Sequence, residues 1–142
     1  MSRVFVHRRE IAFGDVDWAR ILYYPRFLHY CHMAFEAFMA EVTGFPYAVF
    51  LEERGLGFPT VRVEVDYSRP MPYGSVLQIE IKVARLGGKS MNLEYCASVD
   101  GGVRCAQARV TNVLVTMQDF RSLAIPDWLR EGLQPWVHDR ED

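Results

Sequence analysis

The sequence has no apolar run that approaches the length of a membrane span, which takes about 20 residues. Its first residues, Met1-Ser2-Arg3-Val4, lack the apolar segment of a secretory signal peptide. The formal net charge is only −2, whereas proteins that bind nucleic acids through electrostatics carry a strong basic excess. We therefore expect a cytoplasmic protein that binds neither membranes nor nucleic acids.

Cysteine is scarce, with only Cys31, Cys96 and Cys105 in the chain. They form no Cys-x-x-Cys pair, and local spacing cannot assemble four metal ligands. We expect no metal site and three reduced thiols, with Cys31 packed in a helix and the other two on strands.

Repeats, low-complexity segments and linkers are also missing. A chain of 142 residues fits one domain, and an apolar content of 50% is enough to build a core without disulfides or metals. We expect a single domain over residues 1–135 and a charged C-terminal tail over residues 136–142.

Helical periodicity is clearest from about Pro25 to Val42. Pro25 suits the first position of a helix, where its missing N–H costs no hydrogen bond, and Gly44 is typical of a helix end. The apolar residues at helical spacing form one broad stripe: Phe27, Cys31, Ala34, Phe35, Phe38 and Val42. A second, shorter helix is predicted from about Pro46 to Glu53, before Gly55.

Most of the remaining chain alternates between apolar and polar residues, as strands with one buried face do. Predicted strands cover residues 61–67, 77–83 and 93–99, and a further strand runs to about Met117. An earlier strand is predicted over about 3–13, with ambiguous faces. Pro126 then opens a short helix over residues 127–130.

Asp100-Gly101 indicates a hairpin turn. With these two residues as the turn, Glu94 lies opposite Gln107 and Cys96 lies opposite Cys105. A turn at Gly101-Gly102 keeps the same faces and pairs Glu94 with Arg109 instead. Both registers place apolar residues opposite apolar residues, so the pattern does not decide between them.

One helix with a wide apolar stripe and one sheet with a largely apolar face can bury both surfaces if the sheet wraps around the helix. We therefore predict an α+β protein with the hot dog fold, in which a five-stranded antiparallel sheet surrounds a long central helix. The edges of such a small sheet need cover, so we expect a homo-oligomer.

The loop before the long helix carries the strongest functional signal. The run Ile11-Ala12-Phe13-Gly14-Asp15-Val16-Asp17, followed by Tyr23-Tyr24-Pro25-Arg26-Phe27, resembles the start of the 4-hydroxybenzoyl-CoA thioesterase family, which includes the Tol-Pal-associated acyl-CoA thioesterases. The resemblance continues through Glu53-Arg54-Gly55, the strand after Pro59, Lys89-Ser90 and Ala124-Ile125-Pro126. It implies a homodimer or homotetramer that hydrolyses an acyl-CoA thioester to a carboxylic acid and coenzyme A. No cofactor is expected, because coenzyme A is part of the substrate.

The resemblance assigns Asp17 as the catalytic carboxylate, acting as a nucleophile or as a general base. It assigns the Tyr24 amide as the group that polarises the thioester carbonyl. A helix N-terminus suits that role because its first N–H groups have no intrahelical acceptor. An aspartate in this place can also serve only as a loop or helix cap.

Further residues are expected around the substrate. Asp15 is expected to organise the loop and border the site, Tyr23 to frame the acyl group, and Thr60 to line the pocket. Arg85, Lys89 and Ser90 flank the Gly87-Gly88 turn and match a family segment that contacts the nucleotide, although this turn alone is also an ordinary hairpin.

Three alternatives remain open. Glu36, on the other side of the helix from the apolar stripe, is a second candidate acid. A dehydratase is disfavoured, because the loop holds Asp17 where those enzymes carry a histidine, and His7, His29 and His32 are expected at the surface or an interface. The protein could also act on acyl-carrier-protein thioesters, or bind acyl thioesters without hydrolysing them.

One residue departs from the family pattern. Many relatives carry glycine three residues after the catalytic aspartate, and this chain has Arg20. Glycine permits backbone geometries that arginine resists, so Arg20 indicates either a changed loop or an added charge for an acidic acyl group or a phosphate.

Overall fold

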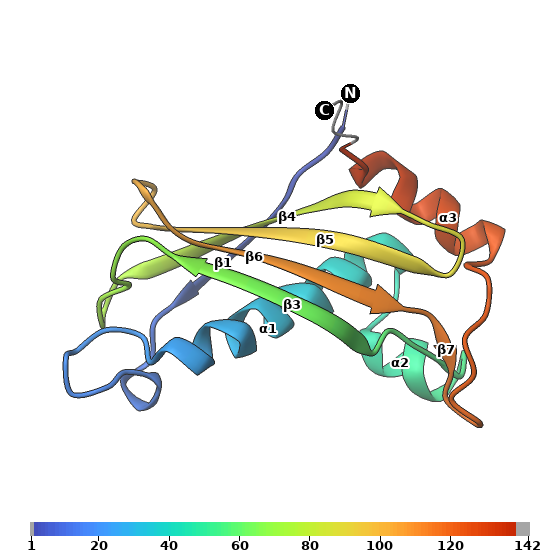
Figure 1. Cartoon of the computed structure of the whole chain (residues 1–142), viewed down its shortest axis with the longest axis horizontal. Coiled ribbons are helices and arrows are strands. Elements are labelled where there is room, and N and C mark those ends of the chain that lie inside the picture. Colours follow the sequence, from blue (N-terminus) through green and yellow to red (C-terminus); the bar gives the residue numbers. More distant parts are fainter. Residues whose placement is uncertain (1, 139–142) are drawn as a thin grey trace.

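The computed structural model describes residues 2–138. Figure 1 shows a sheet, a long helix under it and short helices at one end. The strands of the main sheet are β1 (Phe5–Glu10), β3 (Thr60–Tyr67), β4 (Val76–Leu86), β5 (Ser90–Val99) and β6 (Arg104–Val113). The other elements are α1 (Tyr24–Thr43), α2 (Tyr47–Glu52), α3 (Asp127–Leu133), the two-residue strands β2 (Leu56–Gly57) and β7 (Val115–Thr116), and 3₁₀ turns at Phe13–Asp15 and Gln134–Trp136.

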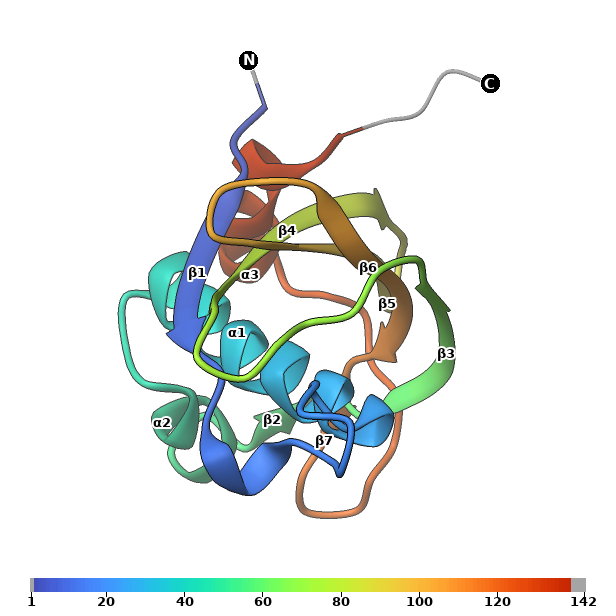
Figure 2. The same cartoon turned by 90° about the vertical axis from the view of Figure 1, so that its left-hand side faces the viewer.

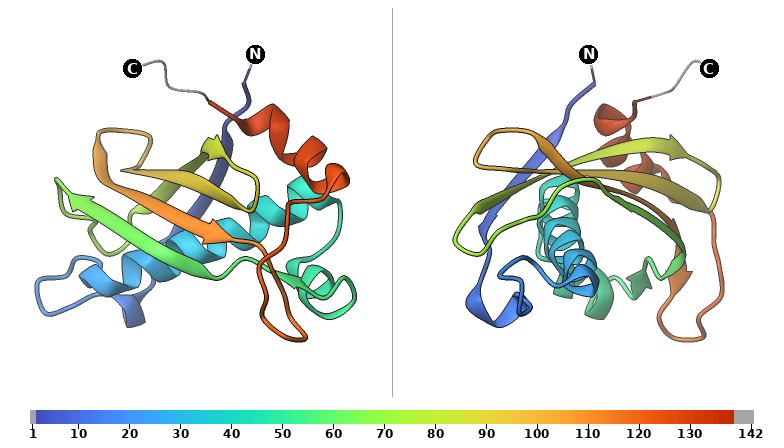
Figure 3. Two further views of the ribbon diagram at one scale, coloured as in Figure 1. Left: turned by 45° about the vertical axis from the view of Figure 1, so that its right-hand side comes forward. Right: turned by 60° about the vertical axis from the view of Figure 1, so that its left-hand side comes forward.

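The main sheet has the strand order β1-β4-β5-β6-β3, and all four pairings are antiparallel. Seen along α1, the sheet arches over the helix (Figure 2). Figure 3 shows α2 below the same concave side, where β2 and β7 pair separately. The predicted five-stranded sheet around a central helix is therefore confirmed.

Helix α1 begins and ends where the sequence predicts. Pro25 lies in its first turn, and Gly44 ends it in the left-handed conformation, with φ of 83°. The predicted stripe faces the sheet, and Phe27, Ala34 and Phe38 are fully buried. Among the described residues, no helix is both long enough and apolar enough to cross a bilayer.

Strand β3 departs from the prediction of one buried face. It is the edge strand next to β6, and seven of its eight residues are exposed in the single chain. Val61 is 62% exposed and Val63 is 42% exposed, because only an open groove lies between this strand and α1. The alternation of β3 is real, but the described residues cover its apolar side only at Val65 and Tyr67 and leave Val61 and Val63 exposed.

The β5–β6 hairpin combines the two predicted alternatives. Asp100 and Gly101 form the turn, with φ of 51° and 70°, and the Gly102 N–H bonds to the Val99 carbonyl at 2.9 Å. An irregularity in the register next to Ala97 then shifts the pairing, so Glu94 lies opposite Arg109. Cys96 consequently faces Gln107 and not Cys105, and all three cysteines are free.

The two ends of the described chain are tied together beside β4. Trp136 is 3% exposed, and Val137 pairs in parallel with Val83. Packing therefore continues past the predicted domain boundary at residue 135. The end of the predicted tail, residues 139–142, lies outside the described residues.

Candidate active site

Asp17 opens a tight turn in the loop before α1. The Arg20 N–H bonds to the Asp17 carbonyl at 2.9 Å, and the Asp17 N–H bonds to the Ile21 carbonyl at 3.0 Å. Within the side chain, Oδ1 accepts the Ala19 N–H at 2.8 Å. Within the described part of the chain, Oδ2 has no hydrogen bond, so one carboxylate oxygen fixes the turn and the other remains free to react.

Arg20 adopts the backbone conformation expected of the glycine that it replaces. Its φ is 66°, in the left-handed region that glycine enters without strain. Its carbonyl accepts the Tyr73 N–H at 2.9 Å, which fixes the turn to the loop before β4. Arg20 therefore holds a backbone conformation that glycine adopts freely and arginine adopts only with strain.

The Asp15 side chain connects the loop to α1. The Tyr30 hydroxyl donates to its Oδ2 at 2.6 Å, and the Arg26 guanidinium lies 3.7 Å from its Oδ1. Tyr30 also accepts the Ala12 N–H at 3.0 Å. Burial, followed by smaller effects that include the hydrogen bond to Asp15, raises the pKa of Tyr30. Both oxygens of Asp15 thus face residues of α1, which supports a structural role more than contact with the substrate.

The Tyr24 amide is a free donor at the start of α1. Pro25 has no N–H, and the Arg26 N–H already bonds to the Tyr23 carbonyl at 2.8 Å. Among the described residues the Tyr24 N–H has no acceptor. The Tyr67 hydroxyl from β3 donates to the Tyr24 carbonyl at 2.5 Å, which holds this peptide in place.

Asp17 and Tyr24 line one cavity of about 410 Å³. We call it the Asp17 cavity, and the loop before β4 forms its far wall through Arg69, Pro70 and Met71. On the other side of Asp17 lies a hollow lined by Phe13, Val16, Trp18, Arg20 and Tyr73. Trp18 is fully exposed there, while Tyr23 is 47% exposed and stacks edge-on against Tyr24. Tyr23 lines neither of these two spaces, so its role in framing the acyl group stays a prediction.

The expected nucleotide contacts lie far from Asp17. In Figure 1 the Asp17 loop is at one end of α1, whereas the β4–β5 turn with Lys89 and Ser90 is at the other end. Arg85 faces a separate hollow on the sheet together with Arg62 and Arg109. Arg130 of α3 donates to the Gly87 carbonyl at 2.8 Å, a contact that no sequence pattern indicated.

The other candidates are accounted for by ordinary contacts. Glu36 is exposed, and its carboxylate lies 2.9 Å from His32 one turn earlier. His29 is also exposed. His7 differs from its prediction, because it is partly buried on β1, and burial lowers its pKa. Thr60 does line a cavity, between α1 and β3.

A family model described as the thioesterase-like superfamily matches residues 11–133. The chain belongs to this superfamily. A 1,4-dihydroxy-2-naphthoyl-CoA hydrolase of Synechococcus elongatus is 32% identical over 128 residues, which cover 89% of this chain and 93% of the relative. A hydrolase of the same name from Thermosynechococcus vestitus is 28% identical over 140 residues, covering 96% and 94%.

The fold agrees with the family. The crystal structure of a thioesterase-superfamily protein from Jannaschia sp. CCS1 has a TM-score of 0.89 and 28% identity, covering 95% of this chain and 94% of that one. The hot dog fold predicted from the sequence is therefore confirmed. The family found is broader than the resemblance to 4-hydroxybenzoyl-CoA thioesterases, which stays a prediction.

Proposed function

We propose that this thioesterase hydrolyses an aromatic acyl-CoA thioester, and that 1,4-dihydroxy-2-naphthoyl-CoA is the first substrate to test. The names of the relatives support the substrate class. The observation that carries the proposal is the Asp17 cavity, where a carboxylate with one free oxygen and the first amide of α1 line the same space.

The chemistry follows from these two groups. In one route, the free oxygen of Asp17 attacks the thioester carbon, the thiolate of coenzyme A leaves, and water hydrolyses the resulting anhydride. In the other, Asp17 takes a proton from a water molecule that attacks the same carbon, and the carbon–sulfur bond then breaks so that coenzyme A leaves as a thiolate, which regains the proton. Both routes place a negative charge on the carbonyl oxygen, which the Tyr24 N–H stabilises at the positive end of the helix.

We further propose that the working unit is a homo-oligomer, a dimer or a tetramer. Asp17 and the turn with Arg85, Lys89 and Ser90 lie at opposite ends of α1 (Figure 1). A second copy can bring its own turn to the Asp17 cavity, so that the acyl group and the nucleotide of one coenzyme A contact different subunits. The exposed edge of β3 supports such pairing.

Replacing Asp17 by Asn tests the proposal. Asparagine keeps an oxygen for the Ala19 N–H, so the turn is retained while the reacting charge is lost. We expect thiol release from aromatic acyl-CoA esters to fall by about 10²–10⁴-fold, with an unchanged circular dichroism spectrum and melting temperature. Glu36→Gln, which removes an exposed carboxylate on α1, is the matched control and should retain activity.

The substrate panel decides between the remaining possibilities. It contains 1,4-dihydroxy-2-naphthoyl-CoA, 4-hydroxybenzoyl-CoA, aliphatic acyl-CoA esters and an acyl-carrier-protein ester. Unchanged turnover in Asp17→Asn would remove Asp17 from the mechanism, and loss in Glu36→Gln would transfer the role to Glu36. Preference for the carrier-protein ester would indicate that substrate instead. No turnover on any ester would indicate a binding protein.

A further inference from the structure

A cavity beside α1 is lined by a tyrosine whose hydroxyl forms no hydrogen bond with the described residues. This cavity has a volume of about 410 Å³ and lies between α1, α2 and the strands β3, β5 and β6. Its walls are mostly apolar and aromatic, including Leu28, Cys31, Phe35, Tyr47, Phe58 and Tyr95. We call it the Tyr95 cavity.

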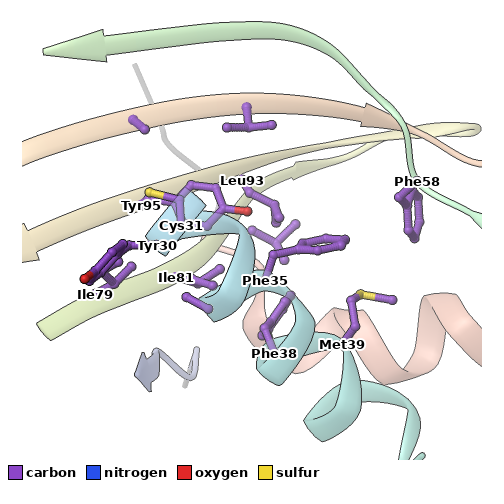
Figure 4. Close-up of a cluster of buried hydrophobic side chains, with 14 of the residues drawn as sticks. Tyr30, Cys31, Phe35, Phe38, Met39, Phe58, Ile79, Ile81, Leu93 and Tyr95 are labelled. Atoms are coloured by element: carbon purple, nitrogen blue, oxygen red, sulfur yellow. The ribbon is translucent and has the colours of Figure 1, made fainter. Parts of the chain in front are cut away.

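Tyr95 on β5 is 3% exposed, and its hydroxyl makes no hydrogen bond to any described residue. In Figure 4 the ring lies beside Cys31, and the hydroxyl points toward the side of the helix where Phe35 lies. Burial raises the pKa of Tyr95, so the hydroxyl keeps its proton at neutral pH and can donate it. The hydroxyl oxygen is not enclosed by protein atoms, so it is available to a molecule that enters the cavity.

A second buried tyrosine provides the contrast. Tyr30 on α1 is 1% exposed, but its hydroxyl donates to Asp15 and accepts the Ala12 N–H. The Tyr30 hydroxyl therefore connects α1 to the loop that contains Ala12 and Asp15. Within residues 2–138 the Tyr95 hydroxyl has no such partner, so phenylalanine would fill nearly the same volume without the loss of an internal hydrogen bond.

The neighbouring strand of the same sheet carries a buried polar atom that no described residue satisfies. Asn112 on β6 is 3% exposed, and its Nδ2 donates to the Phe58 carbonyl at 3.0 Å and to Thr60 Oγ1 at 3.1 Å. Its Oδ1 is buried without a partner among the described residues. The Tyr95 cavity thus has mostly apolar walls, but the Tyr95 hydroxyl and Asn112 Oδ1 form no hydrogen bonds with the described residues.

The Tyr95 cavity follows the Asp17 cavity along α1. Leu28 and Cys31, which line it, lie four and seven residues after Tyr24. At a rise of 1.5 Å per residue, these positions are about 6 and 10 Å along the helix axis from the Tyr24 position. Tyr67 stands between the two cavities, with its ring edge-on to Tyr24 and Phe27. A flat acyl group held by its carbonyl at Tyr24 extends over this distance when it lies along the helix.

We propose that the Tyr95 hydroxyl hydrogen-bonds a ring hydroxyl of the acyl group, one that is not adjacent to the carbon bearing the thioester. Tyr95 is then a specificity-determining residue that distinguishes hydroxylated aromatic acyl groups from unsubstituted ones. This inference rests on the proposed function for the orientation of the substrate. It assigns the Tyr95 cavity to the acyl group and not to coenzyme A.

Two CoA esters that differ in one hydroxyl test the inference: 1,4-dihydroxy-2-naphthoyl-CoA and 1-hydroxy-2-naphthoyl-CoA. We expect the wild-type protein to favour the dihydroxy ester in kcat/KM, and Tyr95→Phe to reduce that preference about tenfold, the usual size for one buried hydrogen bond. An equal loss on both esters would place the contact on the pantetheine arm and overturn the proposal. An unchanged preference would overturn it as well.

Two further measurements separate the possible failures. If the wild-type protein hydrolyses neither ester, the proposed function fails, and calorimetric binding of the two free naphthoic acids decides the inference. Tighter binding of the dihydroxy acid that disappears in Tyr95→Phe supports it, and equal binding of both acids overturns it. Thermal melting is the structural check: Tyr30→Phe should melt at a lower temperature than the wild-type protein, whereas Tyr95→Phe should not.

Discussion

Arg20 holds a backbone conformation that residues other than glycine adopt only with strain. Its φ of 66° places its Cβ close to the neighbouring carbonyl, which costs roughly 1–2 kcal/mol. The turn is kept because hydrogen bonds from both sides fix it, from Asp17 and from Tyr73. The backbone strain at Arg20, close to the candidate catalytic residue, therefore lowers the free energy of unfolding, and a substitution can measure by how much.

We predict that Arg20→Gly raises the free energy of unfolding by about 0.5–1 kcal/mol, because glycine relieves the strain but loses more chain entropy on folding. Urea denaturation measures the difference. Arg20→Ala is the control, since it removes the guanidinium and keeps the strained backbone. If Arg20→Ala is as stable as Arg20→Gly, backbone strain is not the cause.

Sequence patterns identified the residues of the loop but not their geometry. The spacing of Asp15, Asp17 and Tyr24 indicated a carboxylate near a helix N-terminus, and the structure places Asp17 and Tyr24 on one cavity. Tyr95 could not be found in this way, because a tyrosine in an alternating strand is indistinguishable from any other core residue. Only its three-dimensional surroundings show that the hydroxyl has no partner.

At the scale of elements, α3 packs against the end of α1 through a glycine. A Cβ at Gly132 would lie 2.9 Å from the Val42 carbonyl oxygen and 3.2 Å from Val42 Cγ1. The absence of a side chain therefore lets the two helices approach closely. Through Arg130, α3 also holds the β4–β5 turn, so its position affects the proposed nucleotide contacts.

We predict that Gly132→Ala lowers the free energy of unfolding by about 1–2 kcal/mol, because α3 must move away from Val42. Helix propensity alone gives the opposite sign, since alanine favours a helix over glycine by about 1 kcal/mol. Gly88→Ala is the control: a Cβ there has open space, and its stability should stay near that of the wild-type protein. A more stable Gly132→Ala protein would contradict the close packing.

The elements were predictable to the extent that local signals define them. Pro25 and Gly44 mark the ends of α1, and alternation marks β4 and β5, because both signals arise within a few residues. The strands β2 and β7 have two residues each and carry no periodicity. The register irregularity near Ala97 depends on how two strands meet, so composition could not decide between the two hairpin registers.

At the scale of the whole molecule, β3 is an edge strand that is mostly exposed in the single chain. Its outward backbone groups and Val61 are exposed, although its sequence alternates as a buried strand does. The prediction of one buried face failed at Val61 and Val63, because burial depends on what lies next to the edge, and the described residues cover only Val65 and Tyr67. An apolar strand edge of this kind is suited to pairing with another copy.

We predict that the wild-type protein runs as a dimer or a tetramer of its 16.4 kDa chain in light scattering after size exclusion. Val61→Lys should shift it toward the monomer, because a charge on the edge strand opposes pairing. Val103→Lys is the control, since Val103 is 57% exposed beside the β5–β6 turn and away from β3. A monomeric wild-type protein would refute the proposed assembly.

In the proposed assembly, the hydrogen bond from the Tyr67 hydroxyl to the Tyr24 carbonyl connects the subunit contact to the active site. Tyr67 ends the edge strand, and Tyr24 begins the helix whose first amide faces the substrate. Any shift of β3 on pairing is therefore transmitted by a single rigid ring to the peptide next to that amide. In the proposed assembly, only Tyr67 and Tyr24 separate the subunit contact from the carbonyl of the substrate. Dilution that dissociates the subunits is therefore expected to lower turnover as well.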